Sequence, residues 1–506
     1  MTQTRPEGTP SLCGMLSHGA QPAPAACLAH LPWHPWLVVA VCCMGAFIGQ
    51  LDASIVQLAL PRLASVFGAS LEAVSWVALA YLLAFAAFLP IFGRLCEMFG
   101  RKLLYLIGYL LFTVATVLCG TAPSLEWLLA CRALQGVGGA MLGANSIAIL
   151  AAATGPDRRA RAMGWFAAAQ AVGISAGPIV GGVLLDTLDW RWVFWAAVPF
   201  GLAAAALGWL ALPRTAGPVP DRRFDGWGAL LLMPTLTLLV LALNQIAVWG
   251  PASLPFLLCL GAAGALLAAV IRRERRASSP LVDLRLFATP GFVHGAIAAF
   301  LGYALLYGMF FLMSFALVRG YHEAATVAGL RLAVIPVAIG LVAPFSGIPS
   351  ERWGPGRLAA TGMALCIVAL LGLSFVADDP TTGGSLGMAM LALFGAGLGL
   401  FIAPSNHAAL AAAPATLSGE AGAMLNLMRV LGTSLGVASA SAMLSWRMPI
   451  RDDAPQAGWL FEGRSVVDAV ESSLAMLILF AGAAVIVSLL GARSTGQRVQ
   501  LPGTSA

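Results

Sequence analysis

Three ionisable side chains interrupt long apolar segments of the sequence: Asp52, Arg132 and Arg429. A charged side chain inside an apolar helix is costly and usually faces a bundle interior or a water-filled cavity. A low-dielectric environment disfavours the charged form of a carboxylate, so Asp52 could take up and release a proton. Two structural alternatives stay open: Asp52 and Arg132 could form a buried ion pair, or Arg132 could snorkel to the interface from a helix end. Arg429 could bond a carbonyl group or Glu420.

Glycines recur at helical spacing in a second segment. Gly173, Gly177 and Gly181 would lie on one face of a helix, where a neighbouring backbone can approach closely. Pro178 removes one helical hydrogen bond and can bend the helix, and Gly182 follows closely. The segment therefore predicts a helix packed tightly on its neighbours, and a plain packing face is the alternative to a functional one.

A tight turn is predicted at the end of another apolar segment. Gly93 and Gly100 permit the turn, and Arg101 and Lys102 follow it. The carboxylate of Glu97 could face a helix N-terminus or an arginine of a neighbouring helix, although an ordinary basic turn would look similar. The same spacing recurs 254 residues later, which predicts two related halves. The repeated residues are Gly347, Glu351 and Gly354.

The composition places these residues in a membrane protein. Of the 506 residues, 59% are hydrophobic and 10% are charged, against roughly 25% charged in soluble proteins. The mean hydropathy is +0.88. The basic residues lie in short breaks between apolar runs, which argues against a nucleic-acid partner. The nine cysteines contain no CxxC pair, so neither a disulfide framework nor a metal site is predicted. No nucleotide-binding loop or hydrolase motif stands out, so no enzyme activity and no cofactor are expected.

The apolar segments predict an all-α integral membrane fold with fourteen spans, since a helix needs roughly 20 apolar residues to cross a bilayer. They group as six, two and six helices, in two pseudo-symmetric halves. The predicted spans are 35–60, 72–92, 103–121, 125–150, 161–185 and 192–212, then 226–247 and 252–272, then 292–318, 326–349, 357–377, 384–410, 417–445 and 472–491.

The basic residues predict the orientation of these spans. With both termini in the cytoplasm, 19 basic residues lie on the cytoplasmic side and 6 on the outside, as the positive-inside rule favours. The predicted organisation is a disordered cytoplasmic tail over 1–34, a six-helix bundle over 35–212, two inserted helices with basic loops over 213–285, a second six-helix bundle over 286–491, and a cytoplasmic tail over 492–506.

These segments together resemble the major facilitator superfamily, and more narrowly its fourteen-span branch of drug:proton antiporters. The resemblance runs from about Trp36 to Gly491. The segment from Gly93 resembles the loop signature GxLaDrxGrk, with Glu97 for the usual Asp and Met98 for the usual Arg.

Three further segments carry the resemblance. Residues 132–140 match RxxQGxgaA, and residues 173–182 match GxxxGPxxGG, which marks exporters across the superfamily. Residues 51–61 resemble LDxTIVNVALP, with Ser54 for Thr and Gln57 for Asn. Arg429 lies in a run similar to NxxRxxGxSxG of related fourteen-span exporters.

The resemblance implies a proton-coupled antiporter that exports small, amphipathic organic compounds by alternating access. Asp52 would be the main proton-coupling acid, Arg132 would tune it, and Arg429 could contribute. The segment from Gly93 to Lys102 would gate the conformational change, and the segment from Gly173 to Gly182 would be the antiporter motif. The proton gradient would supply the energy in place of a cofactor. We expect a monomer in the cell (inner or plasma) membrane, with the lipid bilayer, protons and a small-molecule substrate as partners.

Aromatic and amide side chains are candidates for a central substrate cavity, although most membrane aromatics only pack or meet lipid. The candidates are Trp76, Tyr81, Gln170, Tyr303, Tyr307, Phe311 and Asn406. The alternatives left open are an exporter of an endogenous metabolite, a membrane sensor that no longer transports, an ion-coupled importer and a membrane-embedded enzyme.

Overall fold

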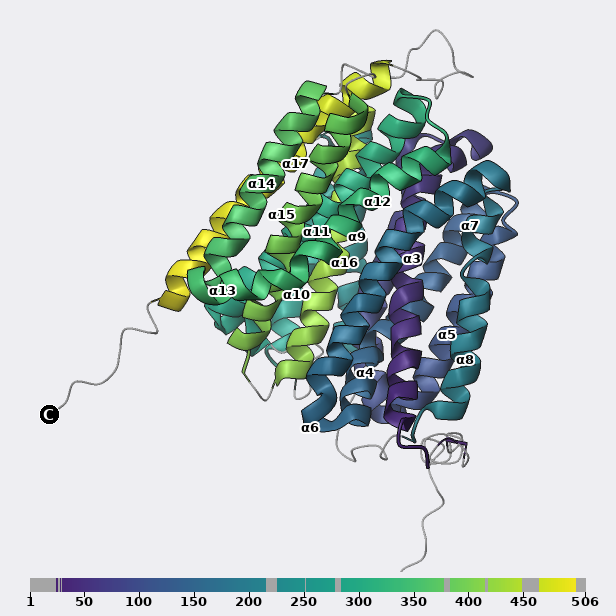
Figure 1. Cartoon of the computed structure of the whole chain (residues 1–506), viewed down its shortest axis with the longest axis vertical. Helices are drawn as coiled ribbons and strands as arrows, with labels where there is room; N and C mark the ends of the chain where they lie inside the picture. The colour runs from purple at the N-terminus through teal and green to yellow at the C-terminus, as the bar shows by residue number, and fades with distance from the viewer. Residues whose placement is uncertain are drawn as a thin grey trace, which may run out of the picture.

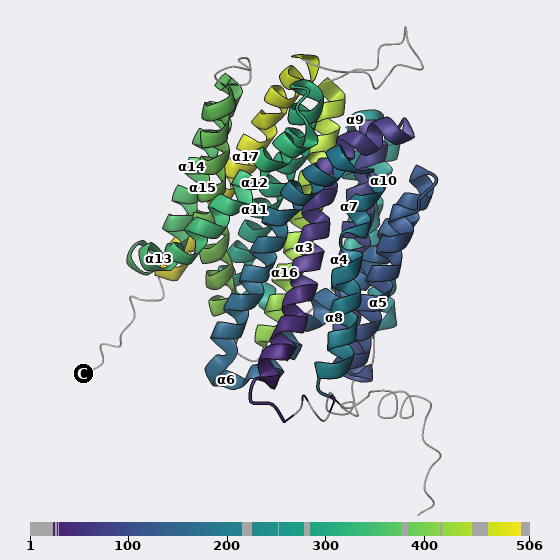
Figure 2. The ribbon, with the colours of Figure 1, turned by 45° about the vertical axis from the view of Figure 1, so that its right-hand side comes forward.

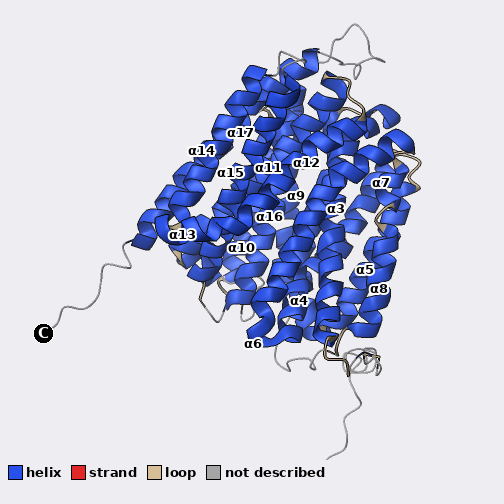
Figure 3. Cartoon of the chain, in the orientation of Figure 1, coloured by secondary structure: helices blue, strands red, loops and turns tan. Residues whose placement is uncertain are grey.

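The computed structural model describes residues 24–25, 28, 30–214, 225–250, 252–277, 284–376, 383–414, 417–447 and 464–496. Within these ranges the chain is built of helices and contains no strand (Figure 3). Most of the two predicted tails, and the middle of the predicted outer loop over 446–471, lie outside the described residues.

The helices form two bundles that stand side by side, the first on the right of Figure 1 and the second on the left. The first bundle consists of α3 (His34–Phe67), α4 (Leu71–Phe99), α5 (Arg101–Gly120), α6 (Leu125–Thr187), α7 (Arg191–Trp195) and α8 (Val198–Ala211). Its end that holds the start of α3 is called the His34 end here, and the opposite end of the molecule is called the Phe67 end.

The second bundle begins after a pair of inserted helices, α9 (Gly226–Trp249) and α10 (Leu254–Glu274). Its elements are η1 (Leu284–Ala288), α11 (Pro290–Phe315), η2 (Ala316–Gly320), α12 (Ala325–Val342), η3 (Ala343–Ser346), α13 (Gly347–Trp353), α14 (Pro355–Val376), α15 (Gly383–Ala412), α16 (Ser418–Arg447) and α17 (Arg464–Gly496).

Short polar side chains begin several of these helices. The Oγ atoms of Ser70, Ser124 and Ser253 accept hydrogen bonds from the backbone N–H groups three residues later, at 3.2, 3.3 and 3.3 Å. Such caps satisfy backbone donors that the first helical turn leaves open, which fixes where α4, α6 and α10 begin.

Thirteen helical segments of the described chain are long and apolar enough to cross a bilayer. The remaining predicted span, the seventh, over 226–247, corresponds to α9, of which Gly226–Ala242 is a shorter apolar stretch. The fourth and fifth predicted spans correspond to Leu125–Gly155 and Asp157–Thr187, which follow each other within α6 and meet at a kink at Gly155, where φ is 68°.

The predicted repeat has the same backbone form in both bundles. Gly100 joins α4 to α5 with φ 95° and ψ 138°, and Gly354 joins α13 to α14 with φ 82° and ψ 146°. Side chains with a Cβ rarely adopt these angles, so glycine is required at both junctions.

The two bundles meet along two seams. The first is formed by α6 with α12 and the second by α4 with α16, while α3 contacts α11 between them. The inserted helix α9 packs on both α4 and α16, and α10 packs on α9 (Figure 2). Only 11% of the membrane-crossing window of α10 is buried, so α10 is the outer helix of the pair.

Candidate functional site

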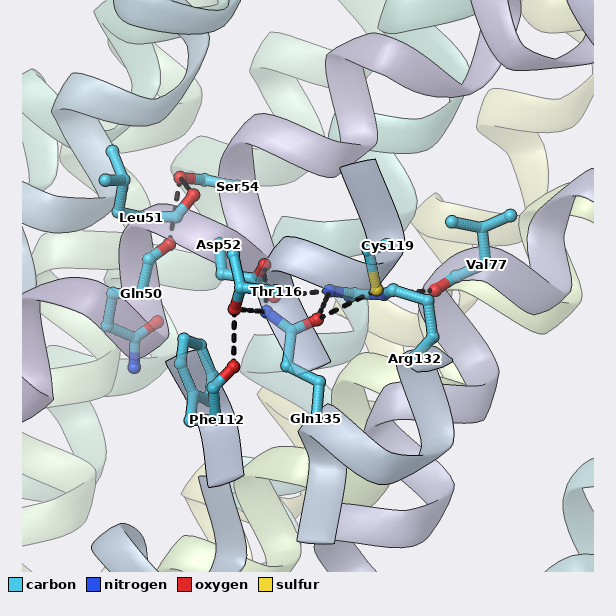
Figure 4. Close-up of polar contacts among 10 residues, drawn as sticks. All are labelled: Gln50, Leu51, Asp52, Ser54, Val77, Phe112, Thr116, Cys119, Arg132 and Gln135. Atoms are coloured by element: carbon cyan, nitrogen blue, oxygen red, sulfur yellow. Dashed lines mark hydrogen bonds and ion pairs between the residues drawn. The ribbon is translucent and has the colours of Figure 1, made fainter. Parts of the chain in front are cut away.

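A buried polar network lies inside the first bundle, and its side chains come from three helices (Figure 4). Asp52 comes from α3, Thr116 from α5, and Arg132 and Gln135 from α6. The last two side chains are three residues apart and therefore share one helix face. The exposed fraction is 2% for Asp52, 1% for Arg132 and 0% for Gln135.

The carboxylate of Asp52 is bonded through both oxygens. Arg132 Nη1 donates to Asp52 Oδ2 at 2.7 Å, and Gln135 Nε2 donates to Asp52 Oδ1 at 2.9 Å. Arg132 Nη1 also donates to Gln135 Oε1 at 2.6 Å, which closes a ring of three side chains.

The ring is anchored to the neighbouring helices. Gln135 Nε2 donates to Thr116 Oγ1 at 2.8 Å, and Arg132 Nε donates to the carbonyl oxygen of Val77 on α4 at 2.8 Å. A buried ion pair persists only when such additional bonds offset its desolvation, and removing one partner typically costs about 3–5 kcal/mol. Loss of the charge on either Asp52 or Arg132 would therefore leave the other charge buried without its partner, which is strongly unfavourable.

Tyr81 contacts this network and also lines a central cavity. The Cζ atom of Arg132 lies 4.6 Å from the centre of the Tyr81 ring and 5.9 Å from that of Phe194. Tyr81 also lines the cavity, so one aromatic ring contacts both the guanidinium group and the cavity.

The cavity has a volume of about 260 Å³ and lies between the two bundles. Its walls come from α3, α4, α5 and α6 on one side and from α11, α15 and α16 on the other. Tyr307 on α11 donates a 3.3 Å hydrogen bond to Gln50 Oε1 on α3, which links the bundles at the cavity wall.

Five of the seven predicted cavity residues line this space, and two do not. The lining includes Tyr81, Gln170, Tyr303, Tyr307 and Asn406. Phe311 is instead fully buried against Phe315, with 5.0 Å between the ring centres, and Trp76 packs against the same apolar core. The helix face that points at this cavity cannot be read from an apolar stretch whose other faces pack or meet lipid.

Arg429 on α16 also lines the cavity. Its Cζ atom lies 5.9 Å from the centre of the Tyr303 ring. Glu420, the predicted alternative partner, is exposed in the first turn of the same helix, nine residues away. Within the described residues Arg429 therefore differs from Arg132, because no carboxylate pairs with it.

The glycine-rich segment of α6 packs against both bundles. A Cβ atom at Gly173, Gly177 or Gly181 would overlap atoms of α3, and at Gly177 the overlap would be with Ser54 Oγ. One at Gly182 would overlap the backbone at Ala325 of α12.

The carbonyl of Pro178 occupies the place where a Cβ of Gly329, also on α12, would lie. This segment therefore carries the close contact between α6 and the second bundle near the Phe67 end.

The turn segment after α4 contributes a different contact. Lys102 is 1% exposed, and its Nζ atom donates to the carbonyl oxygens of Trp209 and Leu212 at 3.0 and 2.6 Å. The only lysine of the chain thus satisfies carbonyl groups at the end of α8. Gly93 lies within α4 and Arg101 is the first residue of α5, whereas the side chain of Glu97 lies outside the described residues.

Sequence reasoning missed several polar residues of the site. Gln135 was visible in its motif but carried no predicted role. Thr116 and Gln50 were not singled out, and neither was Asn426, which lines the cavity. An amide or hydroxyl inside an apolar span is a weaker signal than a charge, because such groups can bond to the backbone of their own helix.

A model of the Major Facilitator Superfamily matches residues 42–437. The chain belongs to this superfamily. A solved structure of a bacterial homologue of the human lysosomal transporter Spinster, inward-facing and unoccupied, has a TM-score of 0.65 at 17% identity and covers 91% of this chain and 97% of its own.

Three relatives are named for a transport or resistance activity. The riboflavin transporter RibZ of Clostridioides difficile is 30% identical over 81% of this chain and 88% of its own length. The multidrug resistance protein Stp of Mycobacterium tuberculosis is 31% identical over 79% and 74%. The tetracenomycin C resistance and export protein of Streptomyces glaucescens is 31% identical over 85% and 79%. The chain is thus a major facilitator transporter with multidrug and antibiotic efflux relatives, and not an enzyme.

Proposed function

We propose that this transporter is a proton-coupled antiporter that exports small, amphipathic organic compounds from the cytoplasm. The observation that carries the proposal is the closed ring of Asp52, Arg132 and Gln135, which is buried beside the cavity and reaches it through Tyr81.

The basic residues support an orientation with the His34 end in the cytoplasm. The cavity lining extends toward that end through Met163, shortly after the Gly155 kink of α6, and through Leu410 and Gly422, near the ends of α15 and α16 there. At the Phe67 end, α6 meets α12, and Arg319 Nη2 donates to the carbonyl of Pro61 at 3.0 Å. In this orientation the structure is closed to the outside and presents its cavity to the cytoplasm.

Proton coupling follows from the charge balance of the ring. Protonation of Asp52 would leave the guanidinium group of Arg132 buried without a counter-charge. That cost favours a rearrangement, and Tyr81 is the cavity residue in contact with the guanidinium group. A substrate in the cavity would displace Tyr81, and a proton would bind Asp52. Both events would then bias the equilibrium between the same two arrangements, which is the requirement for coupling two sites.

The test is transport in sealed, inside-out vesicles with an imposed pH gradient and a panel of organic compounds. We expect accumulation that collapses when the gradient is dissipated, and we expect an Asp52→Asn variant to lose gradient-driven accumulation. Asp189→Asn is the matched control, because Asp189 pairs with Arg191 in an exposed position. Full gradient-driven transport by Asp52→Asn, or transport driven only by a sodium gradient, would contradict the proposal.

A second candidate function is export of an endogenous metabolite. The relative named as a riboflavin transporter favours keeping this candidate, because its similarity spans 81% of this chain. Flavins and other metabolites therefore belong in the compound panel beside antibiotics and dyes.

A further inference from the structure

The charge of the cavity wall narrows the class of compound that the cavity can hold. Among the described residues that line it, Arg429 is the only charged one. The remaining lining is apolar, aromatic, or neutral and polar. The formal charge presented to a bound compound is therefore positive.

The nearby carboxylate does not offset that charge. Asp52 is 2% exposed, its two oxygens accept bonds from Arg132 and Gln135, and it is not part of the lining. Its charge is already balanced by Arg132. Glu420 is nine residues before Arg429 along α16, which is about 13 Å at 1.5 Å per residue.

A cationic compound would meet like charge in this space and would have no carboxylate to pair with. An acidic compound gains a charge-assisted pair, because a guanidinium group binds a planar anion through two parallel hydrogen bonds. Half-buried Arg429 is accessible to such a group from the cavity.

The aromatic wall adds a shape requirement. Tyr303 lies beside the guanidinium group, with 5.9 Å between the Arg429 Cζ atom and the ring centre, and Tyr81 and Tyr307 line the same space. Aromatic side chains favour offset or edge contacts with another ring. A volume of about 260 Å³ is near the lower limit of ligand pockets, roughly 300–1,000 Å³.

We infer that the cavity selects small aromatic acids, whose carboxylate or ionised hydroxyl pairs with Arg429 while the ring lies against Tyr303. The inference rests on the proposed export function for its physiological meaning, and it names the substrate class of that same cavity. Arg429 is then the residue that sets charge specificity, in the opposite bundle from the proton-coupling ring.

The experiment measures equilibrium binding to the purified full chain in lipid nanodiscs, without any gradient. Three probes share one fluorescent ring: a 7-(diethylamino)coumarin-3-carboxylic acid, its neutral methyl amide, and its cationic aminoethyl amide. We expect the acid to bind at least tenfold more tightly than the amide and the cation to bind most weakly. This comparison requires no variant. An acid that binds no more tightly than the amide would overturn the inference.

Variants then locate the cause of the preference. We expect Arg429→Gln to weaken binding of the acid at least tenfold and to change binding of the amide by less than threefold, while Arg429→Lys keeps part of the preference. Arg447→Gln, near the other end of α16 and exposed, is the matched control. Equal weakening of all three probes by Arg429→Gln would show a purely structural role and overturn the assignment.

The outcome is separable from that of the proposed function. If the acid binds as expected but no pH gradient drives its transport, the coupling proposal fails alone. If a gradient drives export of neutral and cationic compounds while the acid fails to bind, the inference about Arg429 fails alone.

Discussion

The carboxylate of Asp186, at the end of α6, accepts a 2.7 Å hydrogen bond from the backbone N–H of Thr326 at the start of α12. Its other oxygen accepts from the N–H of Ala325 at 3.0 Å. The residue that precedes α12 is Ala324, whose side chain cannot cap the helix. The second bundle therefore receives its helix cap from the first, and opening of the Phe67 end by separation of α6 from α12 would break this bond.

Asp186→Ala should weaken that closure. Loss of a helix cap typically costs about 0.5–2 kcal/mol, so we expect the equilibrium to shift about 2- to 30-fold toward opening at the Phe67 end. A longer mean distance between spin labels placed on α6 and α12 at the Phe67 end would report it. Asp189→Ala, three residues along the chain, should leave this distance unchanged, and equal distances in all three proteins would contradict the prediction.

Gln135→Ala should disturb the buried ring without removing either charge. Asp52 Oδ1 and Thr116 Oγ1 would both lose the hydrogen bond that Gln135 Nε2 donates to them. A buried polar group left without a partner costs about 1–3 kcal/mol. We expect a lower melting temperature in detergent and an altered pH profile of transport. Thr116→Val is the milder comparison, because the ring of three side chains stays closed in it. A wild-type pH profile in Gln135→Ala would show that the amide has no part in coupling.

Gly177→Ala should destabilise the contact between α6 and α3. The added Cβ would overlap Ser54 Oγ, and overpacking of this kind typically costs about 1–3 kcal/mol. Gly164→Ala, on the same helix, meets nothing within 4 Å, so helix propensity should make it neutral or slightly stabilising. Equal shifts of the melting temperature in the two variants would contradict the packing explanation.

Comparing Gly354→Ala with Gly347→Ala distinguishes the free-energy cost of backbone strain from that of steric overlap. A Cβ meets nothing within 4 Å at either position, but only Gly354 has a positive φ, at 82°. We expect Gly354→Ala to lose about 1–3 kcal/mol of stability and Gly347→Ala to lose none. Thermal unfolding of the two proteins, measured side by side, checks this difference.

The pH dependence of stability should change when Arg331 is replaced. Burial raises the pKa of the Glu323 carboxyl, and Arg331, paired with it at 2.7 Å, opposes that rise. A raised carboxyl pKa favours the folded state at low pH, and this contribution is lost as the pH rises through the folded pKa. Arg331→Gln should raise the pKa further. Its melting temperature should then fall more steeply above pH 4.5 than that of the unaltered chain.

Charged residues that are costly to bury in apolar helices could be predicted well from the sequence. Asp52 and Arg132 stood out because charges are expensive in apolar helices, and the structure pairs them. The repeated glycines predicted two equivalent turns, and both adopt the same backbone angles.

Neutral polar partners and helix faces were harder to predict. Gln135 completes the ring, yet an amide alone does not reveal which neighbour it bonds. Phe311 and Trp76 were placed in the cavity but lie in the core, because hydrophobicity is the same whether an aromatic ring meets lipid, a packed neighbour or a cavity. The cap from Asp186 to α12 joins residues 140 positions apart and depends on tertiary structure alone.

The inserted helices make the two seams between the bundles unequal. On the α4–α16 seam, α9 lies over both helices and α10 lies over α9, whereas α6 and α12 meet directly at the other. A compound dissolved in the bilayer therefore faces a wall two helices thicker on the first side. Any lateral path from the bilayer to the cavity would therefore cross fewer helices on the α6–α12 side.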